Sequence, residues 1–117
     1  MKRRIIFSLT LCFLAILRPN HANAVTPESI DDVKCFVAAV SLLQTPDNVT
    51  RAAAVSSALY YLGRLDGREP GLDLDKLLAQ ESQRLSPDNL RAELRRCGQT
   101  LTARSQMIKE IGQHLPK

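Results

Sequence analysis

Few side chains in this sequence of 117 residues could carry out chemistry. Beyond residue 24 the only histidine is His114, near the C-terminal end, and no glycine-flanked serine or second histidine accompanies it. A nucleophilic mechanism needs a nucleophile, a general base and a group that orients the base, so no triad can be assembled from these residues. A pair of carboxylates in a cleft could act as general acid and base, but no spacing points to one. We therefore expect no enzymatic activity, no metal site and no bound cofactor.

Cysteine is the second reactive residue type, and the chain has three. Cys12 lies in an apolar N-terminal run that reads as an export signal, so Cys35 and Cys97 remain after export. In an oxidising compartment such a pair is expected to form one disulfide, which would stabilise the fold by about 4 kcal/mol. Two reduced, buried thiols are the alternative. Zinc would need four ligands, more than two distant cysteines and His114 can supply.

A charged segment that glycine and proline interrupt is the richest candidate for binding. We predict that residues 63–72 form the main loop of the protein, because these residues disfavour regular structure. Arg64 and Arg68 could bind an anion or the carboxylate of a partner. In an ordinary solvated loop, the two arginines would instead pair with Asp66 and Glu69.

Two adjacent aromatic residues, Tyr60 and Tyr61, are further candidates for contacting a partner. Neighbouring side chains on a helix point about 100° apart, because a turn takes 3.6 residues. We expect one ring to fill the core and the other to stay half exposed at its rim. The candidate partner-binding residues are thus Tyr60, Tyr61, Arg64 and Arg68.

The first 24 residues have the three parts of a secretory signal peptide. Three basic residues are followed by a mainly apolar run of 13 residues (5–17) and by the small-x-small site Ala22-Asn23-Ala24. A membrane-spanning helix needs about 20 apolar residues, so we favour cleavage over a membrane anchor. Cleavage would leave residues 25–117 as one helical domain, periplasmic or secreted, without an integral membrane segment.

The positive charge of the chain is concentrated in that N-terminal segment. The formal net charge is +4, from 16 basic and 12 acidic residues, and four of the basic residues lie among the first 24. Residues 25–117 therefore carry 12 bases and 12 acids and are formally neutral. Arg91, Arg95 and Arg96 form a basic patch beside Glu93, but a nucleic-acid surface would need more bases. We expect a protein partner and no nucleic acid.

Three helix starts share one pattern, in which a hydroxyl residue is followed by proline and an acid. The hydroxyl can cap free N–H groups, proline needs no N–H at the first helical position, and the acid faces the positive end of the helix dipole. The pattern occurs at residues 26–28, 45–47 and 86–88, and Asp73 is a fourth candidate cap. Apolar residues at 3–4 spacing predict helices over about Pro27–Gln44, Asp47–Arg64, Asp73–Leu85 and Pro87–Leu115.

These elements predict an all-α fold, a small bundle of about four helices, because no alternating or hairpin pattern suggests a strand. Cys35 lies on the first predicted helix beside its apolar stripe, and Cys97 lies on the last. One disulfide would therefore join the first and last helices. Gly98 could kink the last helix.

Three short motifs carry a resemblance to known proteins: Lys34-Cys35-Phe36-Val37, a Tyr-x-x-Gly at residues 60–63 and a Leu-x-x-Cys at residues 94–97. With them the layout resembles small exported helical proteins of Gram-negative bacteria, namely the Hde-type periplasmic acid-stress chaperones and the immunity proteins against type VI amidase effectors. The sequence lacks the aromatic-rich segments of the chaperones and has fewer cysteines than is usual in the immunity proteins. Only the bridge between Cys35 and Cys97 carries over, so the resemblance implies a small binding protein without a defined ligand.

The sequence thus predicts an exported, non-enzymatic helical binding protein. Our first hypothesis is a periplasmic stress chaperone, and the alternative is an inhibitor or immunity protein that binds a secreted enzyme. Below about pH 3 the carboxylates protonate while the basic residues stay charged, so the neutral domain becomes strongly cationic. Self-repulsion could then loosen the helices, still joined by the disulfide, and expose their apolar stripes to unfolding clients.

Overall fold

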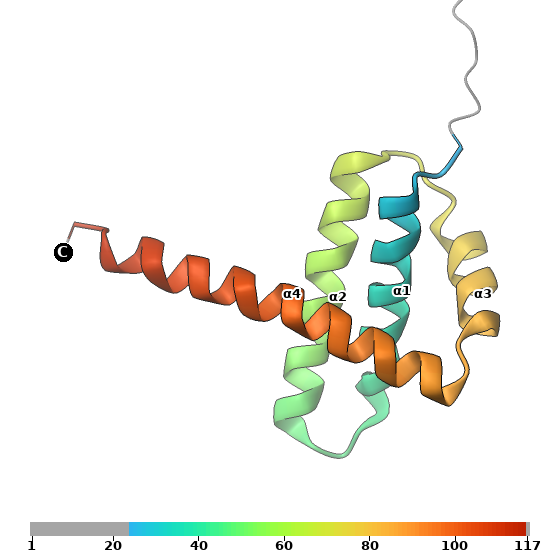
Figure 1. Cartoon of the computed structure of the whole chain (residues 1–117), viewed down its shortest axis with the longest axis horizontal. Helices are drawn as coiled ribbons and strands as arrows, with labels where there is room; N and C mark the ends of the chain where they lie inside the picture. Colours follow the sequence, from blue (N-terminus) through green and yellow to red (C-terminus); the bar gives the residue numbers. More distant parts are fainter. Residues whose placement is uncertain (1–23, 117) are drawn as a thin grey trace, which may run out of the picture.

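The computed structural model describes residues 24–116, which form four α-helices, one short 3-10 helix and no strand. The order along the chain is α1 (Pro27–Ser41), η1 (Leu42–Gln44), α2 (Asn48–Arg68), α3 (Leu74–Arg84) and α4 (Pro87–Gln113) (Figure 1). The predicted all-α class and the number of helices are confirmed. The predicted signal peptide, residues 1–24, lies outside the described residues except for Ala24 and stays a prediction.

Each α-helix begins at a side chain that accepts a hydrogen bond from the backbone N–H three residues later. Thr26, Asp73 and Ser86 cap α1, α3 and α4, as the sequence predicted. For α2 the cap is Asp47 and not the expected Thr45. This difference follows from intrinsic preference, because aspartate is a stronger N-cap than threonine.

The second helix runs one turn further than the sequence pattern predicted, since α2 ends at Arg68 and not at Arg64. The prediction of a loop over residues 63–72 is therefore wrong for its first half. Leu65 supplies the reason, because its side chain is only 1% exposed and packs in a core cluster with Val33. Burying a leucine stabilises by about 1.5–3 kcal/mol, which offsets the cost of about 1 kcal/mol for each glycine within the helix.

The core lies between α1 and α2, which run antiparallel, and α3 packs against α1 (Figure 1). Four alanines of these two helices are buried, namely Ala38, Ala39, Ala54 and Ala58, and such small side chains let two helices approach closely. Two clusters of buried residues fill the interior, one of Val33, Leu65 and Leu77 and the other of Cys35, Tyr61 and Cys97. The second cluster is the point at which α4 joins the rest of the protein.

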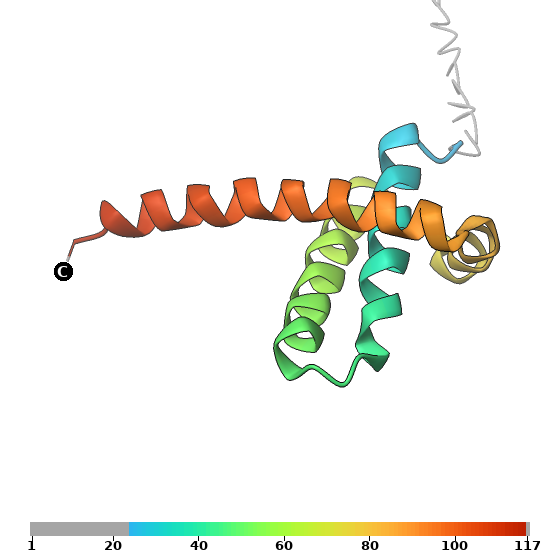
Figure 2. The same cartoon turned by 60° about the horizontal axis from the view of Figure 1, so that its bottom comes forward.

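The last helix crosses α1 and α2 and then continues well beyond them (Figures 1 and 2). It is a single helix through Gly98, so the kink considered there does not occur. In its inner half, Cys97 is bonded to Cys35 with the two Cα atoms 5.6 Å apart, which confirms the predicted link between the first and last helices. In its outer half, every residue from Thr102 onward is exposed. We call residues 102–115 the α4 arm.

Candidate functional site

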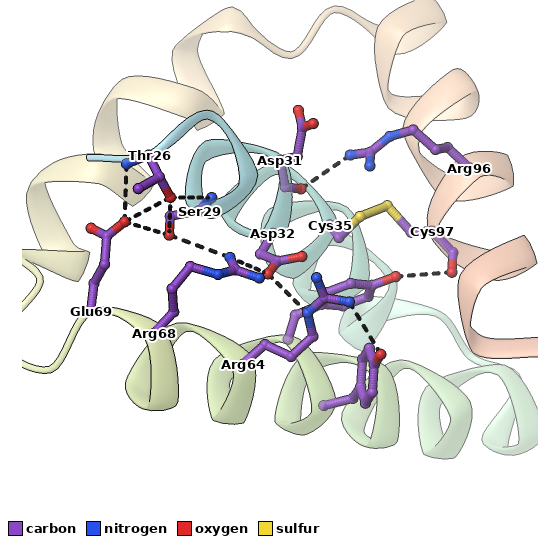
Figure 3. A network of polar contacts seen from close by, with 12 residues as sticks. Thr26, Ser29, Asp31, Asp32, Cys35, Arg64, Arg68, Glu69, Arg96 and Cys97 are labelled. Carbon is purple, nitrogen blue, oxygen red and sulfur yellow. Dashed lines mark hydrogen bonds and ion pairs between the residues drawn. A yellow bond between two sulfur atoms is a disulfide. The ribbon is translucent and has the colours of Figure 1, made fainter. Parts of the chain in front are cut away.

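The candidate arginines of α2 lie on a buried carboxylate of α1 (Figure 3). Asp32 is 6% exposed at its side chain, and its Oδ2 accepts hydrogen bonds from Arg64 Nε at 3.0 Å and from Arg68 Nη1 at 2.8 Å. The solvated-loop interpretation expected these two arginines to pair with Asp66 and Glu69. The structure shows both of them paired with Asp32 instead. Both arginines point toward α1 because the longer α2 places them one turn apart on the same face.

A second carboxylate, that of Glu69, joins the end of α2 to the start of α1 (Figure 3). Its Oε1 accepts hydrogen bonds from Ser29 Oγ at 2.6 Å, from Thr26 Oγ1 at 2.9 Å and from the Thr26 backbone N–H at 3.0 Å. The Ser29 hydroxyl is the main reason that the pKa of Glu69 lies below its ordinary value, with the Thr26 N–H adding to the effect. This carboxylate therefore holds the two helix ends together most firmly when it is ionised.

The two adjacent tyrosines divide their roles as predicted. Tyr61 is buried, and its hydroxyl donates a hydrogen bond of 3.0 Å to the backbone oxygen of Cys97. Tyr60 is half buried, with its ring centroid 5.0 Å from that of Tyr61 and 5.7 Å from the guanidinium of Arg64. Burial raises the pKa of Tyr60, but hydrogen bonds from Arg64 and Arg104 lower it below its ordinary value.

The disulfide region holds the one group of potential metal ligands found among the described residues. The ligand atoms of Cys35, Glu93 and Cys97 lie within 4.8 Å of one another. The two sulfur atoms are bonded to each other, so neither is a thiolate that could coordinate a metal. In this oxidised form the group is a covalent link between α1 and α4.

The predicted basic patch on α4 makes ion pairs with its own neighbours. Arg96 lies 2.6 Å from Glu93 and donates a further hydrogen bond of 3.1 Å to the backbone oxygen of Asp31. Arg91 lies 3.7 Å from Asp88. The patch is thus a solvated face of the helix whose charges are partly neutralised.

An apolar groove of about 290 Å³ opens beside the disulfide, between α1, α2 and α4. Its walls carry aliphatic side chains, with hydroxyl groups from Thr50, Ser57 and Tyr61 and no charged residue. Three aliphatic residues come from different elements, namely Leu42, Val49 and Leu101. The volume is at the lower limit for a small-molecule site, which would also need convergent polar groups to orient a ligand.

The α4 arm carries apolar side chains that sequence reasoning did not assign to a site. Met107, Ile108, Ile111 and Leu115 are 43%, 65%, 54% and 63% exposed. Their 3–4 spacing continues the stripe that the inner half of α4 buries at Cys97. The spacing of these residues predicted an amphipathic helix. It could not show that this helix extends beyond the bundle, so that the last part of its apolar face is exposed. Exposed aliphatic groups gathered along one helix face are a feature of surfaces that bind other proteins.

No protein-family model, curated protein or solved structure matches the chain, so its function is inferred from its own geometry. The resemblance to acid-stress chaperones and immunity proteins stays a prediction. Over the described residues, no helix is both long and apolar enough to span a membrane.

Proposed function

We propose that the chain is an exported, non-enzymatic protein-binding protein, and that its α4 arm presents an apolar face to other polypeptides. The observation that carries this proposal is the exposure of Met107, Ile108, Ile111 and Leu115 along one side of the arm. Together they expose roughly the surface of two complete side chains, and burying it would contribute about 3–6 kcal/mol before the cost of association. That range corresponds to weak binding that further contacts must strengthen.

The polar side chains at the joint between α1 and α2 bond to one another and thereby stabilise the fold, so we look to the apolar surface for the binding role. Arg64 and Arg68 are engaged by Asp32, and Glu69 is engaged by Thr26 and Ser29. Each of these side chains satisfies its partner across the joint between α1 and α2. Among the candidate partner-binding residues, the half-buried ring of Tyr60 remains the one best placed to extend a contact made by the arm.

The chaperone form of this proposal is supported by the carboxylates that hold the bundle together. Asp32 joins α1 to α2, and Glu69 joins the same helices at their ends. Carboxylates in general protonate in strong acid, while arginines stay charged. The bundle would then loosen around the disulfide, and its aliphatic core would add to the apolar surface that the arm already offers.

The test is suppression of client aggregation at about pH 2 and at neutral pH, because carboxylates are largely protonated near pH 2 and ionised near pH 7. We compare the wild type with Ile108→Lys, which places a charge in the apolar face at both pH values, and with Gln106→Lys, which places the same charge on the opposite side of the arm. We expect protection of clients in acid by the wild type and by Gln106→Lys, and reduced protection by Ile108→Lys. A protein that retains its helices and protects no client at either pH would refute the chaperone form.

An inhibitor or immunity protein is the second candidate, and the helical form of the arm favours it. A preformed amphipathic helix can enter an apolar groove of a folded enzyme without first paying for its own ordering. This version predicts a stable 1:1 complex with one secreted enzyme at neutral pH, measured by calorimetry with the purified pair. Loss of the complex in Ile108→Lys, and its retention in Gln106→Lys, would place the arm in the contact.

A further inference from the structure

The apolar face of α4 follows a strict seven-residue pattern in which small and large side chains alternate. The small residues are Gly98, Ser105 and Gly112, and the large ones are Leu94, Leu101, Ile108 and Leu115. A repeat of seven residues is the signature of a helix that packs along a second helix over several turns. Here the alternation of size also restricts the partner, because each large side chain needs a gap opposite it.

The first part of this pattern already packs within the chain. Leu94, Gly98 and Leu101 line the apolar groove against α1 and α2. The next part, from Ser105 to Leu115, is exposed, and the end of α4 continues beyond α1 and α2 (Figure 2). Ser105, Gln106 and Lys109 still line a groove beside α2. Most helical stability in proteins comes from packing of the apolar face, so the arm is a surface built for a helix that the single chain does not supply.

We propose that the arm pairs with the arm of a second copy of this chain, with the two helices antiparallel. This inference rests on the proposed function only in assigning protein binding to the arm. When Ile108 of one copy lies opposite Ser105 of the other, Leu101 falls opposite Gly112, and Leu115, just past the helix end, falls opposite Gly98. A single alignment thus places each large side chain of this stripe from Leu101 onward against a small residue of the other copy, and the two-fold symmetry repeats each contact.

The charges beside this stripe distinguish the antiparallel from the parallel arrangement. In the antiparallel alignment Arg104 lies beside Ile111 of the other copy, and Lys109 lies beside Thr102. In a parallel pair in register, Arg104 would instead lie beside Lys109 of the other copy, and small residues would face small residues across the seam. Like charges at these flanking positions oppose pairing, and voids between the helices forfeit contacts. The sequence of the arm therefore complements itself only head to tail.

A second groove beside α2 can accommodate the end of the partner's arm. An open groove of about 480 Å³ lies where α4 diverges from α2, lined by Ala53, Ser56 and Ser57 together with Gly98 and Leu101. The antiparallel alignment brings Leu115 of the second copy to this groove. The helical overlap from residue 98 to residue 113 is about 24 Å long and about 10 Å wide. That contact is smaller than a standard stable interface, so we expect a dimer of roughly micromolar affinity.

Sedimentation equilibrium of the purified, oxidised protein tests the pairing over about 1–500 µM, a range chosen for the expected weak affinity. We expect a mass that rises from monomer to dimer in the wild type and in Ala103→Glu, and a monomer throughout in Ile108→Glu. A spin label on Gln113→Cys then reports the direction of the helices. Antiparallel arms place the two labels at least about 20 Å apart along the dimer axis, whereas parallel arms place them side by side.

Two results would overturn the inference: a wild type that stays monomeric over the whole range, or labels that lie side by side. The outcome is separable from that of the proposed function. A monomer whose protection of clients depends on Ile108 refutes the dimer and leaves the proposed function intact. A dimer with separated labels that protects no client and binds no enzyme supports the pairing and removes the wider role.

Discussion

The joint between α1 and α2 depends on one buried carboxylate, and Asp32→Asn tests that dependence. The substitution keeps the shape of the side chain and has a similar helix propensity, so it removes mainly the charge. Asp32 is 6% exposed, whereas Arg64 and Arg68 are 33% and 30% exposed. Removing one partner of a fully buried pair costs about 3–5 kcal/mol, and removing an exposed pair costs under about 1 kcal/mol. Because water reaches both arginines, we expect a loss of about 2 kcal/mol.

Urea unfolding at neutral pH, followed by far-ultraviolet circular dichroism, measures this loss as a change in the free energy of unfolding. Asp31→Asn is the matched control, because Asp31 precedes Asp32 on α1 but is 55% exposed and lies 3.5 Å from Lys34. We expect the control to cost under about 0.5 kcal/mol. Combining Asp32→Asn with Arg68→Gln should cost about 1 kcal/mol less than the two separate losses together. Equal losses for Asp32→Asn and Asp31→Asn would show that the buried ion pairs do not hold the joint.

Four further outcomes follow from the structure. Replacing Cys35 and Cys97 by alanine should cost about 4 kcal/mol, because the bridge spans 62 positions, and reduction of the wild type should reproduce the loss in thermal unfolding. The pKa of Glu69 is lower in the folded protein than its ordinary value of 4.5, so ionised Glu69 stabilises the fold above about pH 4.5 and this contribution is lost as the pH falls through the folded pKa. The stability of Glu69→Gln should therefore fall less steeply than that of the wild type when the protein is titrated with acid. Tyr61→Phe should cost about 1 kcal/mol in urea unfolding through the lost hydrogen bond to the backbone, and an unchanged midpoint would show that this bond adds nothing. Deleting residues 102–117 should change the unfolding midpoint of dilute, monomeric protein little, since the bundle does not bury the arm; a loss above about 2 kcal/mol would contradict this.

Local signals in the sequence were sufficient to predict much of the fold. The caps at Thr26, Asp73 and Ser86 each depend on a side chain and an N–H group three residues apart, so short-range chemistry determines them. The disulfide followed from a cysteine count. The end of α2 was missed because burial of Leu65 against α1 outweighs the local preference of two glycines for a turn.

The candidate site was harder to predict, because it depends on how the helices pack and on where α4 leaves the bundle. The arginines at positions 64 and 68 were recognised as important, but their partner Asp32 is distant in the sequence and became visible only through the packing of α1 on α2. Likewise, the stripe on α4 reads the same in its buried and exposed halves. Only the angle at which α4 crosses the bundle separates Leu101, which lines a groove, from Ile108, which is open to solvent.

The disulfide fixes α4 to the bundle at Cys97, close to the point where the arm begins. The residues that the fold requires and the residues that the arm presents therefore occupy different stretches of one helix. Substitutions in the arm can change what it recognises while the bundle folds as before, so evolution can vary the two properties independently. A change in arm length is more restricted, because each inserted residue turns the face beyond it by about 100°. Among short insertions, those of seven or eleven residues keep the direction of the face to within about 20°.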